Sequence, residues 1–279
     1  MKSIFSIDVE DWFNISAVES EPEVSAWDGL PTCVDRDFPR LLELFAESNV
    51  KVTCFFLGYF ARRFPFLVRQ AVEQGHEVAS HGFYHRLVFQ QTPDGFREDV
   101  LSARKLLEDI AGTPVLGHRA AAFSVTRETP WFFERLAQAG YVYDSSVFPA
   151  PHGIGGLKTD RLEPHEIATP SGRIVEFPIS AVRVLGRPMC FFGGGYLRLF
   201  PYALIRSMGR RALRDGRPVV FYIHPREINP DHPRLPMNLK RRFKSYVNLH
   251  TVEGKLRRIV RDFELTTFAD YMARHAVAQ

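Results

Sequence analysis

Cysteine is scarce in this sequence, with three among 279 residues. Cys33, Cys54 and Cys190 are odd in number and far apart, so they fit neither a disulfide framework nor a CxxC metal site. Cys54 lies within the apolar stretch Val52–Leu57, where a buried small side chain is expected. The cysteines therefore indicate a reduced protein without structural disulfides.

Long apolar stretches are also lacking. None approaches the roughly 18–20 uncharged residues that a membrane-spanning helix needs. The first eight residues hold one Lys, a short apolar stretch and then an acid, which is unlike a secretory signal peptide. Hydrophobic residues make up 45% and charged residues 24%, and these values exclude intrinsic disorder. We therefore expect a folded, cytoplasmic protein.

Apolar strands alternate with helical patterns along most of the chain. The expected strands include Ser3–Ile7, Val52–Leu57, His76–Ser80, Val115–His118, Tyr141–Asp144 and Val219–Ile223. The expected helices include Phe60–Gln74, Pro93–Ala111, Pro130–Ala139, Pro201–Arg214, Asn238–Val247 and Val252–Asp262. Residues 149–172 are rich in Pro and Gly and predict a long loop or short hairpins. The alternation predicts an α/β fold of parallel strands joined by helical crossovers.

Charge is distributed unevenly. The chain carries +4 overall, but Arg206–Arg261 holds fifteen Lys or Arg against four Asp or Glu, a net +11 that leaves −7 for the rest. The basic segment has no recognisable nucleic-acid motif, and its cations have the spacing of solvated helix faces. No nucleic-acid partner is therefore predicted.

Three acids follow the first expected strand, in the sequence Asp8-Val9-Glu10-Asp11. Side chains alternate along a strand, so Asp8 and Glu10 can project from the same face. Acids this close repel one another unless a cation or an arginine lies nearby. The alternative is a solvated turn or a helix cap.

Two histidines follow another expected strand, in Ser80-His81-Gly82-Phe83-Tyr84-His85. Imidazoles four residues apart can bind one metal ion, although a pair of ordinary loop histidines is the simpler alternative. With a carboxylate added, such a set leaves coordination positions open for water, as catalytic metal sites require.

Three more polar residues follow strands. Arg119 can hold a carboxylate in a bidentate pair or lie at the surface, and Asp144 can orient a polar group or cap a turn. His224 is either a histidine at the core edge or a general acid. Five polar groups thus follow five strands at their C-terminal ends, which is the rim where barrels of this kind build active sites.

In this order, the motifs resemble those of the polysaccharide deacetylase family with the NodB homology fold (carbohydrate esterase family 4). The resemblance covers nearly the whole chain. Gly75–Gly82 is its most specific stretch, and Lys51–Gly58 resembles the family's second strand. Gly193–Arg198, His224-Pro225-Arg226-Glu227 and the basic C-terminal region resemble one subfamily. That subfamily accompanies exopolysaccharide and exosortase gene clusters and is related to the allantoinase-like branch.

The resemblance implies a distorted (β/α)7 barrel and a divalent metal, usually Zn²⁺. It implies that Asp8 is the catalytic base, that Arg119 orients this base, that His224 is the general acid and that Asp144 tunes this acid. The implied metal ligands are Glu10, His81 and His85. The family's first motif usually has two adjacent aspartates, so Asp11 remains an alternative to Glu10. Ala121 stands where the third motif usually has proline, near the backbone expected to stabilise the oxyanion.

The implied activity is removal of N-acetyl groups from a sugar of an exopolysaccharide or of its lipid- or nucleotide-linked precursor. Two alternatives remain: an allantoinase-like cyclic amide hydrolase and a non-catalytic glycan-binding barrel. Residues 1–230 are expected to form the deacetylase barrel. Residues 231–279 are expected to form a basic extension packed on the same domain, with possible peripheral membrane contact or docking of anionic sugar precursors.

Overall fold

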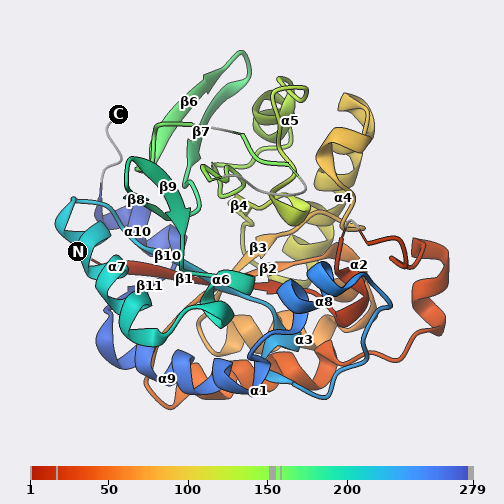
Figure 1. Cartoon of the computed structure of the whole chain (residues 1–279). Coiled ribbons are helices and arrows are strands. Elements are labelled where there is room, and N and C mark those ends of the chain that lie inside the picture. The colour runs from red at the N-terminus through yellow and green to blue at the C-terminus, as the bar shows by residue number, and fades with distance from the viewer. Residues whose placement is uncertain (1, 17, 151–154, 158, 276–279) are drawn as a thin grey trace.

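The computed structural model describes residues 2–16, 18–150, 155–157 and 159–275. Its main strands are β1 (Ser3–Val9), β2 (Thr53–Phe56), β3 (Glu77–Ser80), β4 (Gly117–His118), β5 (Tyr143–Asp144), β6 (His165–Thr169), β7 (Gly172–Glu176), β10 (Val220–Ile223) and β11 (Leu265–Thr266). They form one sheet in the order β10-β1-β2-β3-β4-β5-β7-β6, with β11 also paired to β1 (Figure 1). Neighbours from β10 to β7 are parallel, and β6 pairs antiparallel with β7.

Helices connect and cover these strands. The α-helices are α1 (Val34–Ala46), α2 (Gly58–Arg63), α3 (Pro65–Glu73), α4 (Pro93–Ala111), α5 (Phe132–Gln138), α6 (Gly194–Leu199), α7 (Tyr202–Arg214), α8 (Leu239–Tyr246), α9 (Val252–Asp262) and α10 (Phe268–Arg274). Short 3-10 helices span Trp12–Asn14, Val24–Gly29, Val88–Gln90, Ala121–Phe123, Pro225–Ile228 and Leu249–Thr251. Helices α1, α3 and α9 lie together along the lower side of the sheet in Figure 1. The predicted parallel strands with helical crossovers are confirmed.

One predicted helix is wrong. Phe60–Gln74 is two helices, because α2 ends at Arg63 and α3 starts at Pro65. Phe64 has φ −131° and ψ 63°, outside the helical region, since the ring of a following proline crowds that conformation. Pro65 instead takes the first turn of α3, where its missing N–H costs nothing.

The region 149–172, predicted as a long loop or short hairpins, contains β6, which forms a hairpin with the following β7. A second, separate hairpin of β8 (Ala181–Val184) and β9 (Arg187–Cys190) lies beyond the predicted region. Residues 151–154 and 158 of the predicted loop lie outside the described residues. Within the described part of the chain, no strand pairing joins β10 to β6 or β7, so the sheet is open along that side.

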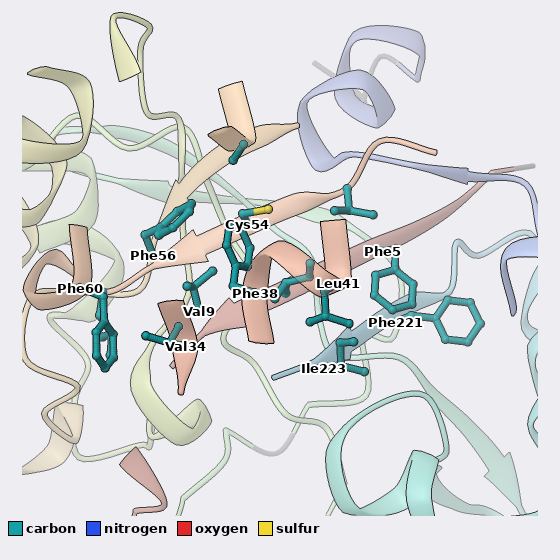
Figure 2. Close-up of a cluster of buried hydrophobic side chains, with 14 of the residues drawn as sticks. Phe5, Val9, Val34, Phe38, Leu41, Cys54, Phe56, Phe60, Phe221 and Ile223 are labelled. Carbon is teal, nitrogen blue, oxygen red and sulfur yellow. The ribbon is translucent and has the colours of Figure 1, made fainter. Parts of the chain in front are cut away.

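The two faces of β1 have different environments. Phe5, Ile7 and Val9 pack into the large core between the sheet and its helices, where Figure 2 shows Phe5 and Val9 among side chains such as Phe38 and Leu41. Ile4 belongs instead to a second core. Because side chains alternate along a strand, Ser6 and Asp8 share the face of Ile4. β1 is thus anchored by one face and presents polar groups on the other.

The second core fills the barrel interior and includes α10. Phe268 has its ring centroid 5.1 Å from Tyr143, 5.0 Å from Phe177 and 5.7 Å from Phe55. Just before it, β11 pairs with β1 through Ser3–Leu265 and Ile4–Thr266. The C-terminal segment is therefore part of the same barrel as the first strand. No helix in the described ranges is long and apolar enough to span a bilayer.

Candidate functional site

A cavity of about 380 Å³ lies where several strands end. Five of the predicted site residues line it: Asp8, Glu10, His81, His85 and His224. Asp8 belongs to β1 and Glu10 follows it, the two histidines follow β3, and His224 follows β10. In parallel strands these ends meet at one edge, so residues far apart in sequence come together there.

Glu10, His81 and His85 form a buried group whose ligand atoms lie within 4.8 Å of one another. Glu10 Oε1 is 2.9 Å from His81 Nε2 and 3.0 Å from His85 Nε2. His81 Nδ1 donates to the carbonyl oxygen of Arg119 at 2.8 Å, and His85 Nδ1 is 3.2 Å from Ser16 Oγ. Both rings therefore turn Nε2 toward the carboxylate.

The donor chemistry of this group fits a divalent cation. The proton on His81 Nδ1 is donated to a carbonyl oxygen, so in neutral His81 the Nε2 atom carries no proton. This Nε2 and the nearby Glu10 carboxylate are then both hydrogen-bond acceptors, and two acceptors so close need a proton or a cation between them. His85 Nε2 is buried and makes no hydrogen bond within the described part of the protein. Two imidazoles and one carboxylate are a common zinc donor set.

Electrostatics within the group point the same way. Burial raises the pKa of Glu10, but His85, His224 and His81 outweigh it and leave that pKa well below its usual range. Burial lowers the pKa of His81, but its hydrogen bond with Glu10 and the charges of Asp8 and Glu10 raise it overall. The carboxylate is thus held ionised by positive charge beside it.

Asp11, the alternative ligand, is occupied elsewhere. Its carboxylate accepts backbone N–H groups of Trp12 at 2.7 Å, Cys33 at 2.7 Å and Val34 at 3.0 Å. These bonds cap a 3-10 helix and tie it to the start of α1. The geometry therefore favours Glu10 as the ligand and gives Asp11 the capping role.

Arg119 and Asp8 form a buried ion pair at the base of the cavity. Arg119 has no solvent exposure, and its Nη1 donates to Asp8 Oδ1 at 2.6 Å and to Ser6 Oγ at 2.8 Å. Its remaining donors reach the carbonyl and hydroxyl oxygens of Ser145, both at 3.1 Å. The guanidinium also lies over the Phe55 ring, 4.2 Å from its centroid. Asp8 is therefore fixed through one oxygen, while Oδ2 lies 4.0 Å from His224 Nε2.

His224 is oriented by a neighbour in its own turn. Its Nδ1 lies 3.2 Å from Glu227 Oε2, and its Nε2 lies 3.8 Å from Glu10 Oε1. Glu227 is itself held by an ion pair with the buried Arg198. Burial and then the charge of Arg226 lower the pKa of His224 well below its usual range.

Asp144 is not the residue that tunes His224, which corrects the prediction. Its Oδ1 accepts from His118 Nδ1 at 2.9 Å and from Ser146 Oγ at 2.8 Å. The sheet order separates β5 from β10 by four strands, so Asp144 and His224 lie on different sides of the barrel. Asp144 instead positions Ser146, whose hydroxyl accepts the Ala120 N–H at 2.7 Å. This N–H is therefore already engaged and is not the expected oxyanion donor.

Two charged residues near the site were not assigned roles from the sequence. Arg226 donates to Glu10 Oε2 at 3.0 Å and so holds the oxygen that does not face the histidines. Glu227 approaches His224 as described above. Both lie in His224-Pro225-Arg226-Glu227, and the spacing of His and Glu by three residues is the signal that could have identified Glu227.

Two family models match consecutive parts of the chain. Residues 24–143 match the model described as polysaccharide deacetylase, and residues 145–273 match a domain of unknown function (DUF3473). A peptidoglycan-N-acetylglucosamine deacetylase of Bacillus cereus is 28% identical over 78 residues, which are 28% of this chain and 37% of that protein. The match thus spans little more than a third of the relative's length.

Solved structures share the fold over nearly the whole chain. A protein from Mycobacterium smegmatis described as a polysaccharide deacetylase has a TM-score of 0.61 at 23% identity, covering 98% of this chain and 90% of the other. The Puue allantoinase has a TM-score of 0.63 at 17% identity, covering 99% of this chain and 91% of its own. A family 4 acetyl xylan esterase from Clostridium thermocellum has a TM-score of 0.53 at 13% identity, covering 99% of this chain and 92% of its own. The predicted distorted (β/α)7 barrel is confirmed.

Replacing Glu10 and Asp11, each in its own variant, by the corresponding amide distinguishes the metal ligand from the residue that caps the 3-10 helix. We expect Glu10→Gln to lower the metal bound per chain, because it removes the anionic donor between the two histidines. We expect Asp11→Asn to keep metal binding but to lower the free energy of unfolding by about 1–3 kcal/mol, because charge-assisted bonds to backbone N–H groups are weakened. Elemental analysis after loading with Zn²⁺, with urea unfolding, measures both. Metal loss in Asp11→Asn alone would assign the ligand to Asp11.

Proposed function

We propose, for a chain whose residues 24–143 match the model of the polysaccharide deacetylase family, that the protein is a metal-dependent hydrolase removing N-acetyl groups from a sugar. One observation carries the proposal. A single cavity brings together a buried carboxylate paired with arginine, a two-histidine and carboxylate donor set, and a histidine at its edge. Amide hydrolysis needs a base, a polarising centre and an acid, and these groups provide one of each.

Glu10, His81 and His85 would hold the metal, with Arg226 fixing the free oxygen of Glu10. When bound, the metal supplies Lewis-acid polarisation of the amide oxygen and lowers the pKa of water toward about 7. The contact from the Arg119 carbonyl to His81 Nδ1 fixes the ring so that Nε2 is the ligand atom. The protein therefore presents a donor set that is oriented in advance.

Asp8 acts as the base in this proposal. Arg119 occupies Oδ1, which leaves Oδ2 to accept the proton of the attacking water. Because the guanidinium is bonded to Ser6 and Ser145 as well, the carboxylate cannot rotate away without breaking a buried network. A base held in one geometry reacts without a further loss of rotational freedom.

His224 acts as the acid. Its Nδ1 faces Glu227, so Nε2 is the atom available to give a proton to the amine nitrogen as the carbon–nitrogen bond breaks. Water contributes its hydroxyl to the acetyl carbon and its proton, through Asp8 and His224, to the amine. The products are acetate and an amino sugar, and the two side chains return to their initial states.

The finer parts of the proposal concern substrate, metal and place. We propose an exopolysaccharide or its lipid- or nucleotide-linked precursor as substrate, Zn²⁺ as the metal, and the cytoplasm as location, which cell fractionation tests. The division into a barrel of residues 1–230 and a packed extension of residues 231–279 also stays a proposal, and within it β11 and Phe268 of the second part belong to the sheet and interior of the barrel. Residues 276–279 of the extension lie outside the part of the chain that the structure describes. The alternative of a non-catalytic barrel is disfavoured, because Asp8, Arg119 and His224 are all present and in contact range.

Asp8→Asn tests the proposed base directly. We expect it to reduce acetate release from N-acetylated chitooligosaccharides by about 10²–10⁴-fold, because Asn cannot accept the proton. Metal content, measured by elemental analysis, is expected to stay at the wild-type value. The same assay with a chelator, and with allantoin as substrate, provides the controls. Wild-type turnover by Asp8→Asn would disprove the assignment, and ring opening of allantoin without acetate release would favour the cyclic amide hydrolase.

The roles of Glu227 and Asp144 can be separated by kinetics. We expect Glu227→Gln to lower kcat by about 10–100-fold with little change in KM, and to shift the pH profile, because His224 loses the carboxylate beside Nδ1. We expect Asp144→Asn to leave the pH profile in place and to lower the melting temperature, because it disturbs buried bonds to His118 and Ser146. The opposite pattern would restore Asp144 as the tuning residue.

Membrane contact through the basic region depends on α8. Leu239 is 83% exposed there and is followed by cationic residues such as Lys240 and Arg242. We expect Leu239→Ser to weaken binding to vesicles containing anionic lipid by up to about 100-fold, because insertion of one Leu contributes about 1.5–3 kcal/mol. Leu185→Ser removes an equally exposed leucine outside α8 and is the matched control in cosedimentation. Equal binding by wild type and both variants would exclude this contact.

A further inference from the structure

Helix α8 forms one wall of the cavity and carries positive charge that the catalytic groups do not use. Arg241, Phe243, Lys244 and Ser245 all line the cavity. We infer that Arg241 and Lys244 form a subsite for an anionic group of the substrate, a phosphate or a carboxylate attached to the N-acetylated sugar. This inference rests on the proposed deacetylase function and narrows its substrate class.

The balance of charge around the cavity leaves these two cations without an ion-pair contact in the described part of the chain, although the charge of Glu21 acts on Arg241 from farther away. Its lining includes four basic side chains, Arg198, Arg226, Arg241 and Lys244, and three acidic ones, Asp8, Glu10 and Glu227. Every one of the acids already has an arginine: Arg119 for Asp8, Arg226 for Glu10 and Arg198 for Glu227. Among the residues that the structure describes, neither Arg241 nor Lys244 has a carboxylate oxygen within 4.0 Å.

Arg241 lies close to the reacting groups. Its Nη2 donates to the carbonyl oxygen of Ser16 at 2.5 Å, and the Ser16 hydroxyl lies 3.2 Å from His85 Nδ1. One residue therefore separates this guanidinium from the group that would hold the metal. A substituent on the same sugar, or on its immediate neighbour, can reach α8 while the acetyl group lies beside Asp8.

Two arginines that line the cavity, one from α6 and one from α8, have buried donors without a hydrogen-bond partner in the described part of the chain. Arg198 is only 4% exposed, and its Nε has no hydrogen-bond partner in the described part of the chain. The Nε of Arg241 is also buried and unpartnered there. Burial and then the charge of Arg226 lower the pKa of Arg198 to about 9, and the same two causes lower the pKa of Arg241. Cations crowded in this way are stabilised by an anion with several acceptor oxygens.

A neutral glycan would leave this arrangement unexplained. Tyr196 and Phe243 line the cavity and can stack on an uncharged sugar ring, which requires no cation. Removing the Arg241 guanidinium from water costs free energy unless an opposite charge replaces the solvent, and the exposed Lys244 adds a second positive charge beside it. The unpaired cations on α8 therefore select for a charged substituent rather than for the sugar itself.

The test compares two pairs of substitutions on the same helix. Arg241→Gln with Lys244→Gln removes two charges from the cavity wall, and Lys240→Gln with Arg242→Gln removes two charges from residues that do not line it. The first readout is binding of inorganic pyrophosphate to the metal-loaded protein by calorimetry. We expect the wall pair to weaken this binding by about tenfold or more and the control pair to change it less than twofold.

The second readout is hydrolysis of three N-acetylated substrates: a neutral chitooligosaccharide, an oligosaccharide containing a uronic acid, and UDP-N-acetylglucosamine. We expect the wall pair to raise KM for the charged substrates and to leave the neutral one unchanged. The two charged substrates distinguish a carboxylate from a diphosphate as the natural group. Lys244→Gln alone, at an exposed position, repeats the test if the double variant is unstable.

The outcomes separate the subsite from the activity. Equal loss of pyrophosphate binding in both double variants would show that the net positive charge of α8, rather than a specific subsite, attracts the anion. That result would overturn the subsite proposal. So would an absence of pyrophosphate binding together with wild-type preference for the neutral substrate, although acetate release would still stand. Pyrophosphate binding that depends on Arg241 and Lys244, without acetate release from any substrate, would keep the subsite and overturn the deacetylase function.

Discussion

A charged arginine with no solvent exposure lies at the centre of this barrel, and its neutralisation constrains everything around it. Arg119 is tolerated there because Asp8 pairs with it and because Ser6 and Ser145 accept its other donors. These partners come from β1 and from the end of β5, so the ion pair fixes the positions of two strands across the interior. The Arg119 carbonyl in turn orients His81, which links the same residue to the metal-binding group.

In β1, one face of the strand packs into the core and the other carries the polar groups of the site. Phe5, Ile7 and Val9, on one face of the strand, are apolar and pack between the sheet and its helices (Figure 2). The other face leads through Ser6 and Asp8 to Glu10, each bonded to a group from a distant strand. Packing of these apolar side chains specifies the register of β1. The polar side chains on the opposite face are therefore positioned without packing contacts of their own. The alternation of side chains along the seven residues of β1 thus determines both a part of the core and a part of the site.

Much of this arrangement follows from local sequence. The strand ends brought Asp8, Glu10, His81, His85 and His224 to one cavity, as the positions of these residues after buried strands predicted. Pro65 divides one expected helix in two, because its ring clashes with the helical backbone conformation of the residue before it. The spacing of apolar residues, from which the helix was predicted, gives no information about this clash. Glu227 rather than Asp144 contacts His224, because that contact depends on which strands are neighbours in space, and the sheet order places β5 far from β10. The role of Arg241 was similarly hidden, since only the folded chain brings α8 beside Ser16.

Strand β11 and helix α10 give the barrel a particular order of assembly. β11 pairs with the first residues of β1, and Phe268 contributes an aromatic wall near Arg119 in the interior. During synthesis, the first strand therefore leaves the ribosome more than 250 residues before its last neighbour, as their positions at Ser3 and Leu265 require. The buried ion pair cannot be fully sealed from water until Phe268 has emerged. Residues 24–143 and 145–273, which match separate family models, thus contribute side chains to one barrel interior rather than to two separate cores.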